Sequence, residues 1–289
     1  MTYPISHKCI ISKMNKRNRM VPYDYTFLAQ ILLQEKLICS ATVIHNCWLL
    51  SAASCFDLTP AWPSYEVRVG VIGMEETYTT HPVLQVFIED NYHHGSNEYN
   101  IALIQVDYMD NINYLTSINL VSTRMNLFEP MSCTILGYNR KNSIELDEIK
   151  MVVANYTDCD YKLNTLRAKE RRYKPNTIGK NNFCLISSEG RNETFCEAII
   201  GGPVLCSSNE HLRGIVVEFP MTKQCNETGP IPVIDISSES EWVQDSILNL
   251  NKKLSFRTAK SSSDLKHISV LILWYNWYSG FCVTLYSNQ

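Results

Sequence analysis

The chain has 289 residues, of which 45% are hydrophobic and 19% are charged, and 26 basic against 29 acidic residues give a net charge of −3. This composition supports a sizeable folded core and excludes a disordered chain. No basic block indicates nucleic-acid binding, and the Gly201–Gly202 pair is followed by Pro203 rather than by a phosphate-binding loop. We therefore expect no nucleic-acid partner and no nucleotide-driven reaction.

Short apolar runs separated by turn residues predict a mostly β protein. The predicted strands lie, in chain order, at 27–33, 37–44, 67–72, 83–87, 101–106, 134–138, 149–153 and 214–219. One helix is predicted over 239–250, with Ser238 as its N-cap and Glu241 completing a capping box. Many strands followed by one terminal helix indicate a β-barrel architecture.

Residues 251–289 differ from the rest of the chain. A basic, Ser-rich stretch precedes an uncharged run at 268–286, which is long enough to span a membrane. Polar residues dilute this run, and the basic residues before it would orient 1–250 toward the cytoplasm, where disulfides do not persist. We weigh membrane anchoring through 268–286, or a removed lipid-anchor signal near 261–263, and favour a disordered or wrongly assigned C-terminal tail.

Eleven cysteines are dispersed along the chain without Cys-x-x-Cys pairs, which favours disulfides over zinc. Disulfides indicate an oxidising compartment, and three Asn-x-Thr sequons predict glycosylation of Asn155, Asn192 and Asn226. Residues 1–20 contain no apolar leader segment. We expect an extracellular, secreted protein whose signal peptide is missing from this sequence, with another export route as the alternative.

Five motifs, in order, resemble those of the chymotrypsin/trypsin-like serine proteases. CSATVIHNCWLLSAASC at 39–55 is similar to the family's disulfide loop ending in T-A-A-H-C, and NEYNIALIQV at 97–106 is similar to its N-D-I-A-L strand. The C-x-x-x-G-W strand and the C-x-G-D-S-G-G-P nucleophile loop of the family resemble SCTILGY at 132–138 and CEAIIGGPVLC at 196–206. The segment from Pro232 through the predicted helix resembles the family's C-terminal end.

This resemblance implies an all-β fold of two six-stranded antiparallel β-barrels with a C-terminal helix. It spans about residues 10–250, which we predict to form a serine protease homologue domain between an N-terminal remnant at 1–9 and the extension at 251–289. It also implies four disulfides, namely Cys39–Cys55, Cys133–Cys206, Cys159–Cys184 and Cys196–Cys225. Cys9, Cys47 and Cys282 are left over, either as buried free thiols or, for Cys9 or Cys47, as links to a partner.

The residues that carry the family's chemistry are replaced. In the family a Ser attacks the substrate carbonyl, a His accepts its proton and an Asp orients the His. The resemblance places Ser54 at the His position, Asn100 at the Asp position and Ile200 at the Ser position. Isoleucine has no nucleophilic atom, serine is no general base near neutral pH, and asparagine cannot stabilise an imidazolium charge. We therefore predict no catalytic residue in this chain.

The surroundings of the predicted site also depart from the family. Ala198 replaces the oxyanion-hole glycine, and Ile199 replaces the Asp that receives the new N-terminus after activation. The former specificity pocket has Thr194 at its floor and no acidic selector for Lys or Arg. Val217-Glu218-Phe219 stands in place of the S-W-G segment that binds substrate backbone, and Phe219 is expected to fill the pocket.

The resulting prediction is a catalytically inactive serine protease homologue that acts by protein binding. It would be a cofactor or decoy for active extracellular serine proteases, as many insect homologues are, with a protease, an inhibitor or a receptor as its partner. The alternatives are an active serine-type endopeptidase with an atypical site, and a decaying gene product. No cofactor and no metal are expected, since the His93–His94 pair lacks a third ligand at a suitable spacing.

Overall fold

The computed structural model describes eleven stretches of the chain: 25–56, 64–71, 78–109, 117–121, 127, 130–138, 146–169, 178–187, 200–207, 211–218 and 229–249. The predicted N-terminal remnant and C-terminal extension lie outside these residues, so the domain boundaries stay predictions. In the described stretches no helix is both long and apolar enough to cross a membrane. The run at 268–286 lies outside them.

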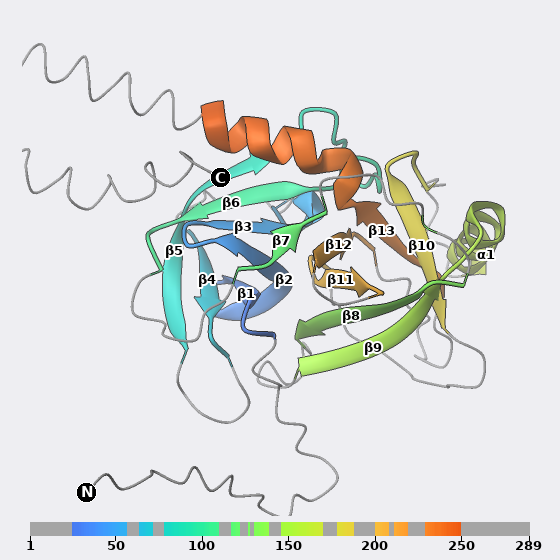
Figure 1. The fold of residues 1–289 in the computed structure, drawn as a ribbon, viewed down its shortest axis with the longest axis horizontal. Coiled ribbons are helices and arrows are strands. Elements are labelled where there is room, and N and C mark those ends of the chain that lie inside the picture. The colour runs from blue at the N-terminus through green and yellow to red at the C-terminus, as the bar shows by residue number, and fades with distance from the viewer. Residues whose placement is uncertain are drawn as a thin grey trace, which may run out of the picture.

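Six antiparallel strands close the first barrel. In spatial order they are β1 (Leu28–Leu33), β2 (Lys36–His45), β3 (Trp48–Ser51), β6 (Ala102–Val106), β5 (Thr79–Ile88) and β4 (Tyr65–Val69). Alternation sets which side chains face inward: Tyr65 and Val67 of β4 are buried, whereas Glu66 and Arg68 between and after them are partly exposed. Figure 1 shows this barrel in blue to green beside the second one.

The second barrel uses the later strands of the chain. Its spatial order is β8 (Ser132–Tyr138), β9 (Leu146–Val153), β10 (Asn182–Ser187), β13 (Ile231–Asp235), β12 (His211–Val216) and β11 (Pro203–Cys206). Pairing of β11 with both β8 and β12 closes the ring, and the short β7 (Asn119–Leu120) lies parallel to β12. The predicted all-β fold of two six-stranded barrels is confirmed.

Several predicted strand boundaries were wrong, including the ends of two strands. The strand predicted at 67–72 ends at Val69, because the next residue, Gly70, has a φ of 78° that breaks the extended backbone. The strand predicted at 214–219 is β12, which ends at Val216. Five strands, β3, β7, β10, β11 and β13, were not predicted as separate elements. Two of them contain proline, Pro203 and Pro232, which weakens a strand signal.

The C-terminal helix covers residues 236–249 and begins three residues before the predicted start. Its N-cap is Asp235, whose Oδ1 accepts the backbone N–H of Ser237 at 2.9 Å. Ser238, the predicted cap, lies inside the first turn and donates its hydroxyl to the Asp235 carbonyl at 2.7 Å. The earlier start follows because β13 runs directly into the helix with an acidic residue at the junction.

A second helix, α1 (Tyr156–Lys169), was not predicted. Cys159 and Leu163, one turn apart, are its only buried residues among those whose burial is described, so its sequence carries no long apolar stripe that would indicate a helix. Asn155 caps it, with Oδ1 accepting the Thr157 N–H at 2.9 Å. The Cys159–Cys184 disulfide then attaches α1 to β10.

The structure contains three of the expected disulfides: Cys39–Cys55, Cys133–Cys206 and Cys159–Cys184. The fourth expected pair, Cys196–Cys225, lies outside the described residues, as do Cys9 and Cys282. Cys47 is fully buried and disulfide-bonded, so the free-thiol interpretation of this residue was wrong.

Candidate functional site

Ser54 and Asn100 meet at one end of the first barrel. Ser54 lies in η2 (Ala53–Phe56), just after β3, and Asn100 lies just before β6. Because β3 and β6 are antiparallel neighbours, with Ser51 opposite Ala102, these two ends coincide. Asn100 Oδ1 accepts the Ser54 backbone N–H at 2.9 Å, and its Nδ2 donates to Ser54 Oγ and to the Ser96 carbonyl, both at 3.2 Å. Asn100 is 2% exposed, so these bonds fix it firmly.

Ile200 is held against the same end of this barrel by its backbone. Its carbonyl accepts the Ser40 N–H at 2.9 Å, and the next residue, Gly201, has a φ of 81°. A Cβ on Gly201 would overlap the Ser40 carbonyl and the Ser51 hydroxyl, which already hydrogen-bond to each other at 2.8 Å. The turn therefore requires glycine here for both its backbone conformation and its close approach.

The Ile200 side chain is half-buried and packs against the hydrophobic clusters of both barrels. Its neighbour on β2, Ser40, follows Cys39, whose disulfide partner Cys55 directly follows Ser54. The Cys39–Cys55 disulfide and the Ser40–Ile200 backbone hydrogen bond thus connect Ser54 with Ile200, and the side-chain hydrogen bonds of Asn100 connect it to Ser54. We call Ser40, Ser51, the Ile200–Gly201 turn and the Cys39–Cys55 disulfide the site frame.

The segment at 216–218 lies beside this turn. Gly201 donates its N–H to the Val216 carbonyl at 2.8 Å, and Val216 donates to the Gly202 carbonyl at 3.0 Å. Glu218 then reaches back to the first barrel, where its Oε2 accepts Asn97 Nδ2 at 2.8 Å. Asn97 is 3% exposed and lies in the loop that leads to Asn100.

Three further contacts hold that loop to the second barrel. Asn182 donates from Nδ2 to the Asn97 carbonyl at 3.0 Å, and Lys180 donates its backbone N–H to Glu98 Oε1 at 3.3 Å. The Glu98 side chain occupies the space where a Cβ of Gly179 would lie. We call the contacts among Asn97, Glu98, Gly179, Lys180, Asn182 and Glu218 the inter-barrel latch. The sequence placed Glu218 in the substrate-binding segment but gave no role to its partner Asn97.

A buried carboxyl lies close to the latch. Glu239 of the C-terminal helix is 4% exposed, and its Oε1 accepts Asn181 Nδ2 at 2.9 Å and Ser238 Oγ at 3.1 Å. Burial raises the pKa of Glu239, the two hydrogen bonds oppose the rise, and the negative charges of Glu89 and Asp235 add to it. Burial also lowers the pKa of His45.

Several predicted site residues lie outside the described part of the chain. They are the pocket positions Thr194 and Phe219, the loop positions Ala198 and Ile199, and the sequons at Asn192 and Asn226. His93 and His94 are exposed on the loop before Asn100. Among the residues whose structure is described, no group of three His, Cys, Asp or Glu side chains could hold a metal ion.

The chemistry available at the three central positions is limited. They present a hydroxyl that accepts a hydrogen bond from an amide, the carboxamide that donates it, and an aliphatic side chain. General-base catalysis near neutral pH needs a group that gains and loses a proton there, and none of these three does so. The side chains at these three positions therefore offer hydrogen bonding and apolar contact.

Comparison with known proteins assigns the family. Residues 15–243 match the family model described as Trypsin. The chain is 24% identical over 257 residues to the urokinase-type plasminogen activator of Gallus gallus, which covers 83% of this chain and 58% of that protein. It is 24% identical over 242 residues to a collagenase of Hypoderma lineatum, covering 81% of this chain and 86% of the collagenase. The chain thus spans less than two thirds of the avian relative.

The fold comparison agrees. Mouse neuropsin, a serine protease, superposes with a TM-score of 0.63 at 20% identity, covering 80% of this chain and 98% of the neuropsin chain. This similarity concerns the fold, whereas the family match rests on the sequence between residues 15 and 243. Together with the two barrels and the site frame, that match shows that the chain belongs to the trypsin family.

Proposed function

We propose that this protein is a catalytically inactive serine protease homologue that acts by binding another protein. The observation that carries the proposal is the state of Ile200. Its carbonyl is fixed by Ser40 in a turn built on Gly201. The sequence resemblance assigns this position to the family's nucleophile. The side chain displayed there has no oxygen, nitrogen or sulfur atom, so no acyl-enzyme can form at this position.

The hydrogen bonds of Ser54 and Asn100 support this proposal. Asn100 Oδ1 accepts the Ser54 N–H, and Asn100 Nδ2 donates to Ser54 Oγ, so the pair forms a closed polar contact. A nucleophile brought to this site would find a serine hydroxyl rather than an imidazole, and proton abstraction would have no acceptor.

The inter-barrel latch supports binding by another surface. In the family, the segment matched by 217–219 hydrogen-bonds to substrate backbone. Here Glu218 of that segment bonds to Asn97 of the facing barrel, and Val217 is 3% exposed. An extended peptide would have to compete with contacts that the protein makes with itself. We infer a cofactor or decoy role outside the cell, and the disulfides favour that extracellular location.

Affinity capture tests this role. The full chain, secreted behind an added leader and immobilised, is incubated with extracellular fluid from its source, and bound proteins are identified by mass spectrometry. A reduced and alkylated sample of the same chain is the control for non-specific adsorption. We expect a trypsin-family protease, a protease inhibitor or a receptor to be retained by the folded chain only. Turnover of a broad peptide library by the purified chain, or retention of no protein, would overturn the proposal.

A further inference from the structure

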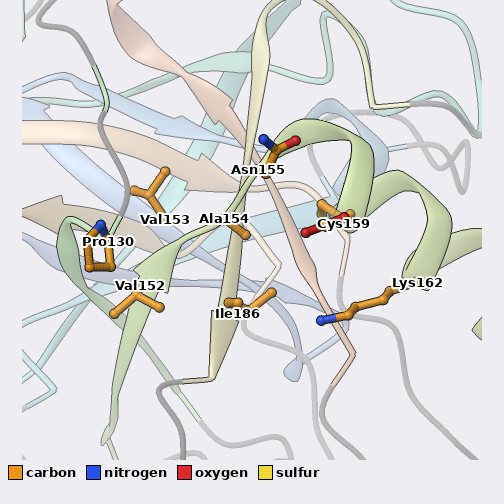
Figure 2. Close-up of a pocket in the computed structure, with 9 residues that line it drawn as sticks. Pro130, Val152, Val153, Ala154, Asn155, Cys159, Lys162 and Ile186 are labelled. Atoms are coloured by element: carbon orange, nitrogen blue, oxygen red, sulfur yellow. The ribbon is translucent and has the colours of Figure 1, made fainter.

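A pocket of about 300 Å³ lies on the second barrel beside α1, away from the site frame. The end of β9, the first turns of α1 and β10 enclose it. Figure 2 shows Val152 and Ile186 low in the pocket, Pro130 at one side and Lys162 extending from α1 toward Ile186. Its wall is therefore mainly aliphatic, with charged groups contributed by α1.

Asn155 lines this pocket and is the sequon asparagine within the described residues. Its Oδ1 is committed to Thr157, accepting both the backbone N–H at 2.9 Å and the hydroxyl at 2.6 Å. Figure 2 shows the amide oxygen on the α1 side and the amide nitrogen on the other side. Asn155 and Thr157 are both exposed, so the helix cap uses the oxygen and leaves Nδ2 accessible.

We propose that Asn155 carries an N-linked glycan whose first sugar covers this pocket. This inference rests on the proposed extracellular location, because N-glycosylation occurs in the secretory route. Asn155 Nδ2 forms a C–N bond with the anomeric carbon of a lipid-pyrophosphate-linked oligosaccharide. The anomeric C–O bond breaks, the lipid pyrophosphate leaves, and Nδ2 loses one proton.

The pocket suits the first sugar, an N-acetylglucosamine, in both size and chemistry. Val152 and Ile186 offer partly exposed aliphatic surface for the acetamido methyl group and for the apolar face of the sugar ring. Asp158 and Lys162 stand one turn apart on α1 and line the same pocket, so they can accept from and donate to the sugar's hydroxyl and amide groups. A glycan attached at the rim needs no separate binding event to reach this surface.

Site-resolved mass spectrometry and lysine labelling test the proposal. The full chain is expressed in a eukaryotic secretory system as wild type, as Thr157→Ser, which keeps the sequon, and as Thr157→Ala, which removes it. Both variants keep the Asn155 cap on the backbone N–H of residue 157. Asn155→Asp is a second variant that cannot carry a glycan at residue 155, and it retains an N-cap. Acylation rates by a small amine-reactive ester are measured for Lys162, with the exposed Lys36 and Lys180 as internal references.

We expect a glycan on Asn155 in the wild type and in Thr157→Ser. Lys162 should be acylated several-fold more slowly in these two proteins than in the two variants without a glycan at residue 155. Lys36 and Lys180 should react equally in all four proteins. An unmodified Asn155 in folded protein, whether secreted or retained in the cell, would overturn the proposal. So would a glycan on Asn155 that leaves the Lys162 rate unchanged. Neither result depends on partner binding or peptide turnover, so failure here is distinct from failure of the proposed function.

Discussion

The site frame and the inter-barrel latch lie at the same junction but are built from different kinds of contact. The frame consists mainly of a backbone hydrogen bond, a glycine turn and a disulfide, none of which needs a particular side chain at position 200. The latch consists mainly of bonds made by polar side chains, led by Asn97 and Glu218. The frame can therefore keep its geometry whichever side chain stands at position 200, whereas the latch depends on the identity of its polar side chains.

The largest loss of stability is expected when the Cys133–Cys206 disulfide, which follows the site frame along the chain, is removed. Cys206 ends the strand after the Ile200–Gly201 turn and pairs with Cys133, 73 residues away, whereas Cys39 and Cys55 are 16 residues apart. Loop-closure entropy predicts a loss of about 4 kcal/mol in the free energy of unfolding for the double Cys→Ala variant of the long pair, and about 3 kcal/mol for the short pair. Denaturant unfolding of both variants gives the ranking. A larger loss for the short pair would mean that the frame depends on its own disulfide more than chain entropy predicts.

The next effect concerns the frame's glycine turn. Gly201→Ala should lower the free energy of unfolding by about 3 kcal/mol, because backbone strain adds to overlap with the Ser40 carbonyl and Ser51 hydroxyl. Gly95→Ala is the matched control, since Gly95 has a φ of 80° in a partly exposed loop, and it should cost about 1 kcal/mol for strain alone. Equal losses in the two variants would show that the turn does not press against β2.

A double-mutant cycle measures how strongly the side chains of the inter-barrel latch stabilise the fold. Asn97→Ala and Glu218→Ala should couple by about 1.5 kcal/mol in unfolding free energy, because their hydrogen bond involves a carboxylate. Glu218→Ala combined with Ser54→Ala provides the comparison pair, with a coupling near zero expected. A coupling near zero for the first pair as well would reduce the latch to a contact without energetic weight.

The two regions also differ in how much of their structure could be predicted from the sequence. The resemblance of five local motifs to the trypsin-like family predicted both barrels, because each motif is a local run of residues. The structure brings Ser54 and Asn100 together and holds Ile200 against the same barrel. The latch could not be predicted in the same way. Asn97 and Glu218 are 121 residues apart and each is an ordinary polar residue in its own segment.

Helix α1 was not predicted because its packing also depends on a residue distant in the sequence. Its packing depends on Leu163 and on the Cys159–Cys184 disulfide rather than on a continuous apolar stripe. The start of the C-terminal helix was misplaced because Asp235 belongs to a strand and caps the helix at the same time. Signals that serve two elements at once are read correctly only when the neighbouring strand is known.

The smallest effect is a pH dependence near the latch. The pKa of Glu239 is raised in the folded state, so its contribution to stability is fully present below the unfolded pKa and is lost as pH rises through the folded pKa. Glu239→Gln keeps an acceptor for Asn181 and has no charge to bury. Its free energy of unfolding, followed by denaturant unfolding from about pH 4 to about pH 8, should fall less with rising pH than that of the wild type. If the variant lost as much unfolding free energy with rising pH as the wild type, the pH dependence would belong to groups other than Glu239.

Covalent labelling with a fluorophosphonate, which phosphonylates activated serine hydroxyls, tests directly whether the protein has an activated nucleophile. The folded full chain and its Ile200→Ser variant are treated side by side with an active trypsin-family protease. We expect the protease alone to be labelled, because Ile200 offers no nucleophile and a serine at that position would still lack a base at Ser54. Stoichiometric labelling of the folded wild type, mapped to a single residue by mass spectrometry, would contradict the account and establish a catalytic centre that the site frame does not contain.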